Sequence, residues 1–426
     1  MERRNKMFKK FVSVLMGVGL LLMMSSGVIA AETVKIGFLD PLSGPFANVG
    51  DAGYKHFKYA ADMINAQGGD QRFEIVPFDS KLSVSESLIH LKNAIDQGIR
   101  FMTHGTGSNI SGALIEAISK HNERNPDQQV LYLNYSAVDP ALTNEGCSFW
   151  HFRFDSHSDM KLAAITDYIK DQKNIKKVYL INQDYVFGHA VRDASIAMLK
   201  AKRPDIEIAG DTLHPIGKVK DFSPYIAMIK ASGADAVITG NFGSDMSLLV
   251  KAGKSAGLNV QYFTFYAGGI GSVPAIGEAG VGHVKQVTEW HNNLWFEENK
   301  PDDEKYFMGY NRKYGGEGKA PFFFLRIRTM MEMMDKAIKK AGSADAKNVA
   351  YALEGMTHKT PYGTVTMQAS DHQLIQPLYI STLSNAGTKT VKYDVENTGF
   401  GWKTDKRIEA DATAMPTTCK MEKPAR

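Results

Sequence analysis

The stretch Thr33–Asp51, TVKIGFLDPLSGPFANVGD, decides how this chain is to be folded. Its first seven residues form the short apolar run of a buried strand, and a turn with two prolines and two glycines follows. A helical pattern then begins and is expected to span residues 50–67. In open parallel sheets, ligands lie at the carboxyl ends of strands. We therefore expect this turn to lie beside a cleft, with the prolines fixing its backbone.

The same alternation of short apolar runs and longer amphipathic segments continues in two series. Strands of four to seven residues alternating with helices of ten or more indicate parallel sheets with helices on both faces, an α/β fold. The expected strands are TVKIGFL, FEIVPFD, IRFMTHG and QVLYLNYS, then KKVYLIN, IEIAGDTLH, ADAVITG and VQYFTFY. The expected helices span 50–67, 83–97, 108–120, 190–202, 222–232 and 245–256, with later ones at 321–341 and 347–353.

Two extended segments, CSFWHFRFDSHSD and VGHVKQVTEWH, separate these series and indicate that the chain crosses between two lobes. KTPYGTVTM and QPLYISTL have the pattern of hairpin strands. We expect residues 33–154 and 288–362 to form lobe 1, and residues 155–287 and 363–418 to form lobe 2. In this division the C-terminal tail joins lobe 2.

Residues 1–30 have the pattern of a cleaved secretory signal peptide. Five basic residues precede an uncharged apolar segment, and small residues end it, with Val28 and Ala30 in cleavage-site spacing. A retained N-terminal anchor is the alternative, and no cysteine lies near the cleavage point to carry a lipid. Without the signal peptide the chain has 45 basic and 45 acidic residues. This balance does not favour a nucleic-acid partner.

Only two cysteines occur, Cys147 and Cys419. In an oxidising compartment such as the periplasm, one disulfide between them is expected. Two free thiols are the alternative.

Sequence motifs for catalysis, metals and cofactors are lacking. THGTGSNISG does not fit the nucleotide fingerprint because Ile110 stands at its last glycine position, and GxSxG, HExxH and Walker motifs do not occur. His151 and His157 share one face of an extended segment, but no third ligand is evident, so a structural role is expected rather than a metal site. An enzyme is therefore disfavoured, and we expect no metal or cofactor.

Five loops at expected strand ends are rich in glycine, serine and aromatic residues. They are HGTGSN, NYSAVDP, NQDYVFG, GNFGSD and FYAGGIG. Small residues let backbone amides approach a ligand, and helix N-termini near Ser108 and Ser136 would favour an anion such as a carboxylate. These loops predict one shared cleft.

The chain resembles the periplasmic leucine/isoleucine/valine-binding proteins, the type I substrate-binding proteins of ABC importers. The resemblance rests on VKIGFLDPLSGPFANVGD, AADMINAQGG, SAVDPALT, VYLINQDYVFG, DFSPYIAMIK and ADAVITG, which occur in family order along nearly the whole chain. It implies two α/β lobes joined by three hinge crossovers that close over a small ligand. It also implies periplasmic location and docking on a membrane permease.

The resemblance further implies which residues contact a ligand. Gly107 and Ser108 match a loop that holds the ligand carboxylate, and Ser136, Ala137 and Val138 match a loop that adds donors. Phe187 and Phe242 match aromatic residues that pack from the second lobe. Tyr135, Tyr185 and Tyr266 extend this set, since stacked rings suit a flat apolar acid.

Two departures from the family pattern bear on the ligand. Val138 replaces the usual threonine, and FTFYAGGIGS contains no acid where amino-acid binders carry a glutamate for the ligand ammonium. A buried ammonium without a partner costs on the order of several kcal/mol. Unless Asp184 or Asp245 reaches the ligand, we expect a small carboxylate without an α-amino group, aromatic acids included. A branched-chain amino acid and a ligand-sensing role remain alternatives.

Overall fold

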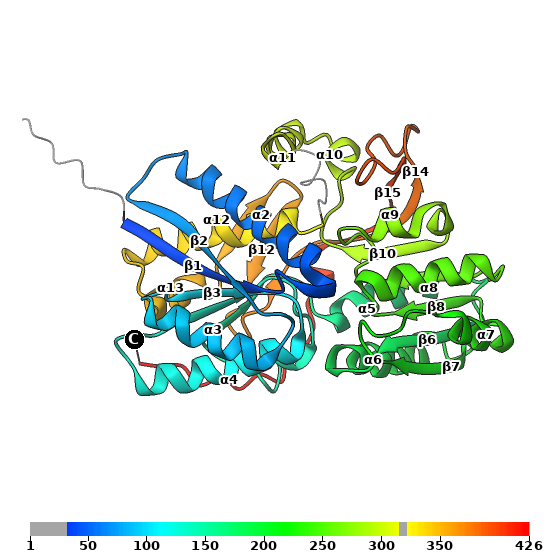
Figure 1. The fold of residues 1–426 in the computed structure, drawn as a ribbon, viewed down its shortest axis with the longest axis horizontal. Coiled ribbons are helices and arrows are strands. Elements are labelled where there is room, and N and C mark those ends of the chain that lie inside the picture. Colours follow the sequence, from blue (N-terminus) through cyan, green and yellow to red (C-terminus); the bar gives the residue numbers. More distant parts are fainter. Residues whose placement is uncertain (1–31, 315–321, 426) are drawn as a thin grey trace, which may run out of the picture.

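The computed structural model describes residues 32–314 and 322–425, and the predicted signal peptide lies outside the described residues. The chain forms two lobes, each built around its own sheet (Figure 1). The predicted two-lobed α/β architecture is confirmed.

Lobe 1 contains a five-stranded, all-parallel sheet in the order β2-β1-β3-β4-β5. Helices α2 and α12 lie on one side of this sheet, and α3 and α4 lie on the other (Figure 1). The bounds are β1 Glu32–Asp40, α2 Ala47–Asn65, β2 Gln71–Asp79, α3 Val84–Asp96, β3 Phe101–His104, α4 Ser108–Arg124, β4 Leu131–Asn134, β5 His151–Arg153, α12 Phe324–Ala341 and α13 Ala346–Leu353.

Lobe 2 contains a seven-stranded sheet in the order β15-β14-β10-β9-β8-β6-β7. Strands β6 to β10 pair in parallel, whereas β14 and β15 extend the sheet antiparallel. The bounds are α5 Ser158–Lys170, β6 Lys177–Gln183, α6 Val186–Lys202, β7 Glu207–His214, α7 Ser223–Ser232, β8 Ala236–Thr239, α8 Gly243–Ser255, β9 Gln261–Thr264, α9 Ser272–Ile276, β10 Val284–Thr288, β14 Leu378–Asn385, β15 Phe400–Ile408 and α14 Ala410–Thr413.

The parallel part of each sheet has the same strand order. In both lobes the second strand lies at one edge beside the first, and the third, fourth and fifth follow on the other side. The direction of winding therefore reverses between β1 and β3 and again between β6 and β8. In such sheets ligands bind outside the carboxyl ends of strands, close to the reversal.

The chain crosses between the lobes three times. The first crossing follows β5, the second follows β10, and the third links β13 (Leu374–Ile375) to β14. After the second crossing, α10 (Leu294–Glu297) and α11 (Pro301–Tyr314) form an aromatic cluster with Tyr59 of lobe 1 and Tyr379 of lobe 2. This segment therefore packs on both lobes.

The structure corrects the expected division of the chain in its last part. Strand β11 (Thr357–Thr360) pairs directly with β12 (Gly363–Met367), so the expected boundary at residue 362 would cut a hairpin. Residues 363–375 lie with lobe 1, where Gln373 forms a bridge to Arg153 at the end of β5. Of the expected 363–418 segment, the strands that join the lobe 2 sheet are β14 and β15.

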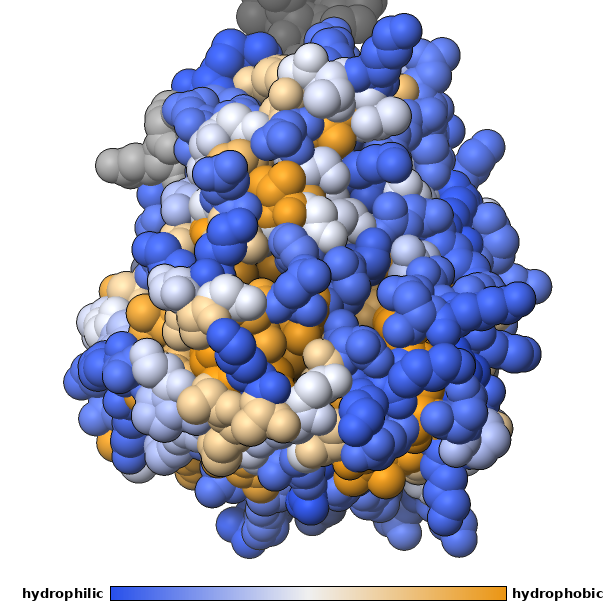
Figure 2. Space-filling model, turned by 90° about the vertical axis from the view of Figure 1, so that its right-hand side faces the viewer, coloured by the Kyte–Doolittle hydropathy of each residue, from blue (hydrophilic) through white to orange (hydrophobic). Residues whose placement is uncertain are grey.

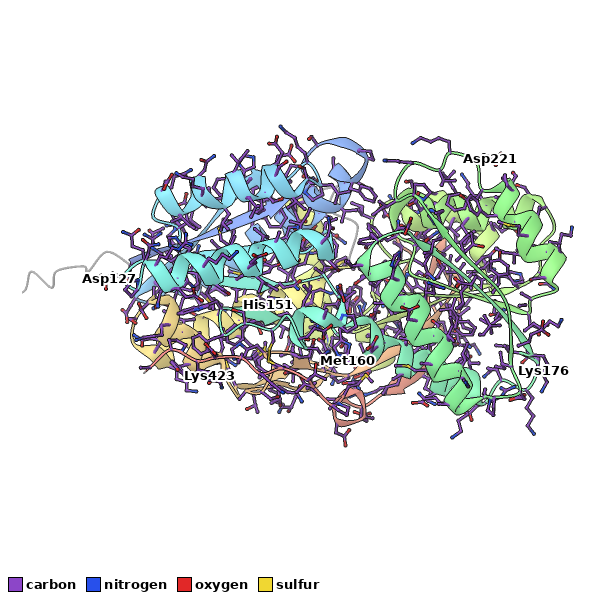
Figure 3. The ribbon with its side chains drawn as sticks, turned by 90° about the horizontal axis from the view of Figure 1, so that it is seen from below. Asp127, His151, Met160, Lys176, Asp221 and Lys423 are labelled. Atoms are coloured by element: carbon purple, nitrogen blue, oxygen red, sulfur yellow. A yellow bond between two sulfur atoms is a disulfide. The ribbon has the colours of Figure 1, made fainter. Side chains whose placement is uncertain are left out.

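The C-terminal tail also lies on lobe 1 rather than lobe 2. Thr417 Oγ1 donates to the carbonyl of Thr143 at 3.2 Å, and Lys423 forms an ion pair with Glu354. Lys423 accordingly lies on the side of lobe 1 when the molecule is seen from below (Figure 3). A disulfide joins Cys147 to Cys419, with Cα atoms 5.7 Å apart, and holds the tail in this place.

This disulfide gives a direct chemical prediction. Alkylation of the unfolded protein without reductant should add no label, because the two cysteines of the chain are paired. After reduction two labels should be added, as read by intact mass. Label on unreduced protein would contradict the pairing.

The outer end of lobe 2 is mainly hydrophilic, with apolar side chains lying between the polar ones (Figure 2). Within residues 32–314 and 322–425, every helix is too short or too polar to cross a bilayer.

Candidate functional site

A cavity, partly open to solvent, lies between the two lobes. Most of its lining comes from loops at the carboxyl ends of strands, which follow β3 and β4 in lobe 1 and β6, β8 and β9 in lobe 2. The lining residues are Val49, Gly105, Thr106, Gly107, Ser108, Ser136, Ala137, Val138, Tyr185, Phe187, Phe242, Gly243, Tyr266, Gly269, Ile270, Ser272, Phe322 and Phe323.

The structure brings nine of the ten expected ligand residues around this cavity. Tyr135 is the exception. Its ring is fully buried in lobe 1, directly beneath Gly105, and its hydroxyl donates to Asp40 Oδ2 at 2.7 Å. Tyr135 therefore supports the loop that lines the cavity and does not itself line it.

Asp40, at the end of β1, holds the loop 105–108 in place. Its carboxylate accepts hydrogen bonds from the amides of Gly105 at 3.1 Å and Thr106 at 2.9 Å, besides the one from Tyr135. The loop leads into α4, which begins at Ser108 after Gly107, a residue with φ of 111°. Amides at the start of a helix have no intrahelical acceptor and favour an anion, so this end of the cavity suits a carboxylate.

The loop at residues 136–138 offers a ligand fewer free hydrogen-bond donors than the resemblance implies. The amides of Ser136 and Ala137 both donate to Asn134 Oδ1, at 3.1 and 2.8 Å. A ligand therefore cannot use these two amides without displacing Asn134. The hydroxyl of Ser136 accepts from Arg326 Nη1 at 3.4 Å, which leaves its hydrogen available to a ligand.

Among the described residues, six aromatic rings surround the rest of the cavity. Tyr185, Phe187, Phe242 and Tyr266 come from lobe 2, and Phe322 and Phe323 come from the segment before α12. Phe322 packs edge-on against Tyr266, with ring centroids 5.6 Å apart. The helix expected over 321–341 would include Phe322 and Phe323, whereas α12 begins only at Phe324. The run of phenylalanines at 322–324, which spans the start of the helix, was the available signal.

The described residues that line the cavity include no Asp, Glu, Lys, Arg or His. The two acids that could have served an ammonium, Asp184 and Asp245, do not line the cavity, although Asp245 Oδ1 is buried without a hydrogen-bond partner among the described residues. Asp184 is exposed and pairs with His189 at 2.7 Å. Asp245 is buried, and its Oδ2 accepts from Gln183 Nε2 at 2.7 Å and from the amide of Gly217 at 2.8 Å.

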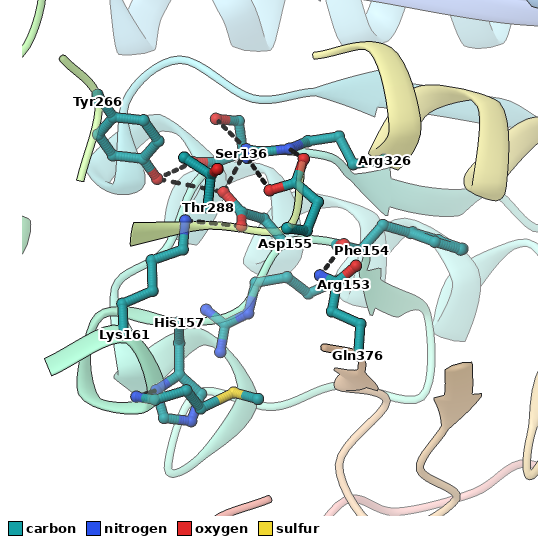
Figure 4. A network of polar contacts seen from close by, with 12 residues as sticks. Ser136, Arg153, Phe154, Asp155, His157, Lys161, Tyr266, Thr288, Arg326 and Gln376 are labelled. Atoms are coloured by element: carbon teal, nitrogen blue, oxygen red, sulfur yellow. Dashed lines mark hydrogen bonds and ion pairs between the residues drawn. The ribbon is translucent and has the colours of Figure 1, made fainter. Parts of the chain in front are cut away.

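Charged groups instead gather directly behind the cavity, at the crossings between lobes. Arg326 of α12 pairs with Asp155 of the first crossing and, at 2.6 Å, with Glu289 of the second. Lys161 of α5 pairs with the other oxygen of Asp155 at 2.7 Å. Figure 4 shows Arg326 and Lys161 approaching Asp155 from opposite sides. All four side chains are fully or almost fully buried.

The third crossing and the cavity both connect to this cluster. Gln376 Nε2 donates to the carbonyl of Phe154 at 3.0 Å, and the hydroxyl of Tyr266 lies 3.3 Å from Asp155 Oδ2. Tyr266 also donates to the carbonyl of Ser136 at 3.2 Å, from one lobe to the other. Burial and the Asp155 carboxylate together hold the pKa of Tyr266 well above its ordinary value, so the hydroxyl remains a donor.

His151 and His157 have structural partners. His151 is buried and its ring contacts the carbonyl of Leu142 at 3.1 Å and Asn134 at 3.2 Å, whereas His157 accepts from the amide of Met160 at the start of α5. Burial holds the pKa of both imidazoles well below the ordinary range, so both are neutral. Across the described part of the chain, no cluster of His, Cys, Asp and Glu is arranged to bind a metal ion.

Comparison with known proteins gives a consistent result. A family model described as periplasmic binding protein matches residues 33–388. The Leu/Ile/Val-binding protein homolog 4 of Brucella melitensis is 29% identical over 405 residues, which cover 93% of this chain and 94% of the relative.

Solved structures agree. The leucine-, isoleucine-, valine-, threonine- and alanine-binding protein of Brucella ovis, in its closed conformation, superposes with a TM-score of 0.82 at 29% identity, covering 92% of this chain and all of the other. A solute-binding protein of an R. palustris ABC transporter, in complex with 4-hydroxybenzoate, gives a TM-score of 0.75 at 19% identity, covering 89% and 98%.

Proposed function

The chain belongs to the periplasmic binding protein family, and on this premise we propose that it captures a small carboxylate without an α-amino group for an ABC importer. Aromatic acids are included in this class. The lobes close over the ligand, and the ligand leaves chemically unaltered. Because the ligand contacts both lobes only when they are closed, it binds the closed state more tightly than the open state and shifts the equilibrium toward closure.

One observation carries the choice of ligand: the described lining offers hydroxyls and helix amides at one end and aromatic rings over the rest, without a charged side chain. A carboxylate can be held by the start of α4 and the hydroxyls of Ser108 and Ser136. Ser108 Oγ accepts from the amide of Asp139 at 3.3 Å, which leaves its hydrogen for the ligand. The six rings suit a flat apolar body.

A branched-chain amino acid is the second candidate, because two of the similar proteins are named for leucine, isoleucine and valine. Its ammonium would enter a site where the described lining provides no carboxylate. The cost of an unpaired buried charge is on the order of several kcal/mol. The 4-hydroxybenzoate complex of a protein with the same fold supports the idea that such lobes can close on an aromatic acid.

The partner in transport would be a membrane permease, and the place of action the periplasm. The membership of the chain in this family supports both proposals. A ligand-sensing role on the same fold would use the same cavity.

A thermal-shift panel tests the proposed ligand class. We expect benzoate, 4-hydroxybenzoate or another small acid to raise the melting temperature, because a ligand that binds only the folded state stabilises it by mass action. Benzyl alcohol, which lacks the carboxylate, is the matched control and should give no shift. Stabilisation only by free leucine, isoleucine or valine would contradict the proposal.

A further inference from the structure

Phe46 belongs to lobe 1 by sequence but packs on lobe 2. It ends the short helix η1 (Gly44–Phe46) in the turn after β1, and its side chain is 3% exposed. Its ring centroid lies 5.3 Å from that of Phe242, the residue before α8. Figure 1 shows the start of α2 next to α8 accordingly.

Lobe 2 offers a recess for this ring, formed by Gly217 and Gly243. A Cβ atom on Gly217 would lie 3.2 Å from the Phe46 ring, and one on Gly243 would lie 3.1 Å from it. Both glycines have positive φ, 67° and 58°, which other residues rarely adopt. The amide of Gly217 donates to Asp245 Oδ2 in the first turn of α8, so lobe 2 itself fixes the shape of the recess.

The turn that carries Phe46 is held from lobe 1. The amide of Leu42 donates to Asp79 Oδ1 at 2.8 Å, and the carbonyl of Pro41 lies so close to Gly50 that a Cβ there would be 2.0 Å from it. Pro45 precedes Phe46 and restricts the backbone further. A second contact crosses the cleft nearby, from Asn48 Nδ2 to the carbonyl of Ile270 at 3.1 Å.

We propose that Phe46 is a latch between the lobes, a positioning residue that raises ligand affinity without contacting the ligand. Phe46 is absent from the cavity lining, whereas its neighbours Phe242 and Gly243 are part of it. Separation of the lobes would expose the ring, and closure buries it. Because apparent affinity scales with the population of the closed state, the latch strengthens binding of every ligand alike. The inference rests on the proposed closure over a ligand.

The test compares Phe46→Ala with Phe46→Leu and with Phe73→Ala, which removes a ring buried in lobe 1 at 3% exposure. Dissociation constants are measured for benzoate, 4-hydroxybenzoate and L-leucine. The separation of the lobes is measured between spin labels at Lys92→Cys of α3 and Lys200→Cys of α6, both exposed. The native cysteines are paired and should not react.

Phe46→Ala should weaken binding about 10- to 100-fold, the equivalent of exposing a buried phenylalanine ring. The closed fraction should fall, and the melting temperature of the unliganded protein should stay unchanged. Phe46→Leu should be intermediate. Phe73→Ala should lower the melting temperature and leave affinity and lobe separation unchanged.

Wild-type affinity and closed fraction in Phe46→Ala would overturn the latch. The latch would also be overturned if Phe46→Ala lowered the melting temperature of the unliganded protein as much as Phe73→Ala does, since Phe46 would then be an ordinary core residue. If none of the three compounds binds the wild-type protein, the proposed ligand class fails instead. The latch is then judged by the closed fraction of unliganded Phe46→Ala, which must fall below that of the wild type.

Discussion

Replacing Arg326 with methionine is expected to lower the free energy of unfolding by about 3–5 kcal/mol, because two buried carboxylates lose their shared partner. Arg326 contacts Asp155 and Glu289, which belong to two different crossings between the lobes. Burial acts to lower the pKa of Arg326, but these two carboxylates outweigh it and the pKa is raised, so the guanidinium stays charged. The unfolding free energy is measured with urea.

Lys339→Met on the same helix is the matched control. Lys339 pairs with Asp335 but is exposed, so its loss should cost less than about 1 kcal/mol. Adding Glu289→Gln to Arg326→Met should recover part of the loss, since Glu289 is then no longer an unpaired buried acid and Asp155 keeps its ion pair with Lys161. An Arg326→Met variant as stable as the Lys339→Met control would show that the cluster does not hold the crossings together.

Replacing both Ser108 and Ser136 with alanine is expected to weaken ligand binding by about 2–6 kcal/mol, since each hydroxyl hydrogen bond to a charged group contributes about 1–3 kcal/mol. Both hydroxyls line the cavity, and both have already accepted a hydrogen bond from the protein, Ser108 from Asp139 and Ser136 from Arg326. Calorimetry with the acid of the thermal-shift panel that stabilises most gives the change.

Ser119→Ala is the control, because Ser119 lies on α4 like Ser108 but pairs with Ser148 away from the cavity. It should bind the acid as the wild type does. Unchanged affinity in the double variant would place the carboxylate elsewhere in the cleft.

Local patterns predicted most of the fold. The strand and helix that flank the turn after Asp40 follow from apolar runs and periodicity, and the two series of parallel strands follow from their alternation with helices. The strand-end loops then had to converge, because parallel strands end at one edge. Contacts between residues far apart in the sequence were harder to predict. Asp155 and Arg326 are 171 positions apart, and no local pattern relates them.

Three expectations from the sequence differ from the structure, and each difference has a physical cause. Tyr135 follows a strand like its neighbours, but its hydroxyl finds Asp40 beneath the loop and so turns away from the cavity. Asn134 Oδ1 accepts hydrogen bonds from the amides of Ser136 and Ala137, which were expected to donate to a ligand. The division expected from sequence places the tail in lobe 2, although the expected disulfide to Cys147 ties the tail to a residue of lobe 1. Combining that pairing with the lobe boundaries would have placed the tail correctly.

Calorimetric titration with L-leucine and with 4-methylpentanoate isolates the role of the ammonium group, since the two acids share one carbon skeleton and differ only by that group. The account predicts that 4-methylpentanoate binds more tightly, because the lining accommodates its carboxylate and apolar chain and offers leucine no partner for its positive charge. Tighter binding of leucine would contradict it and would mean that an acid reaches the ligand after all.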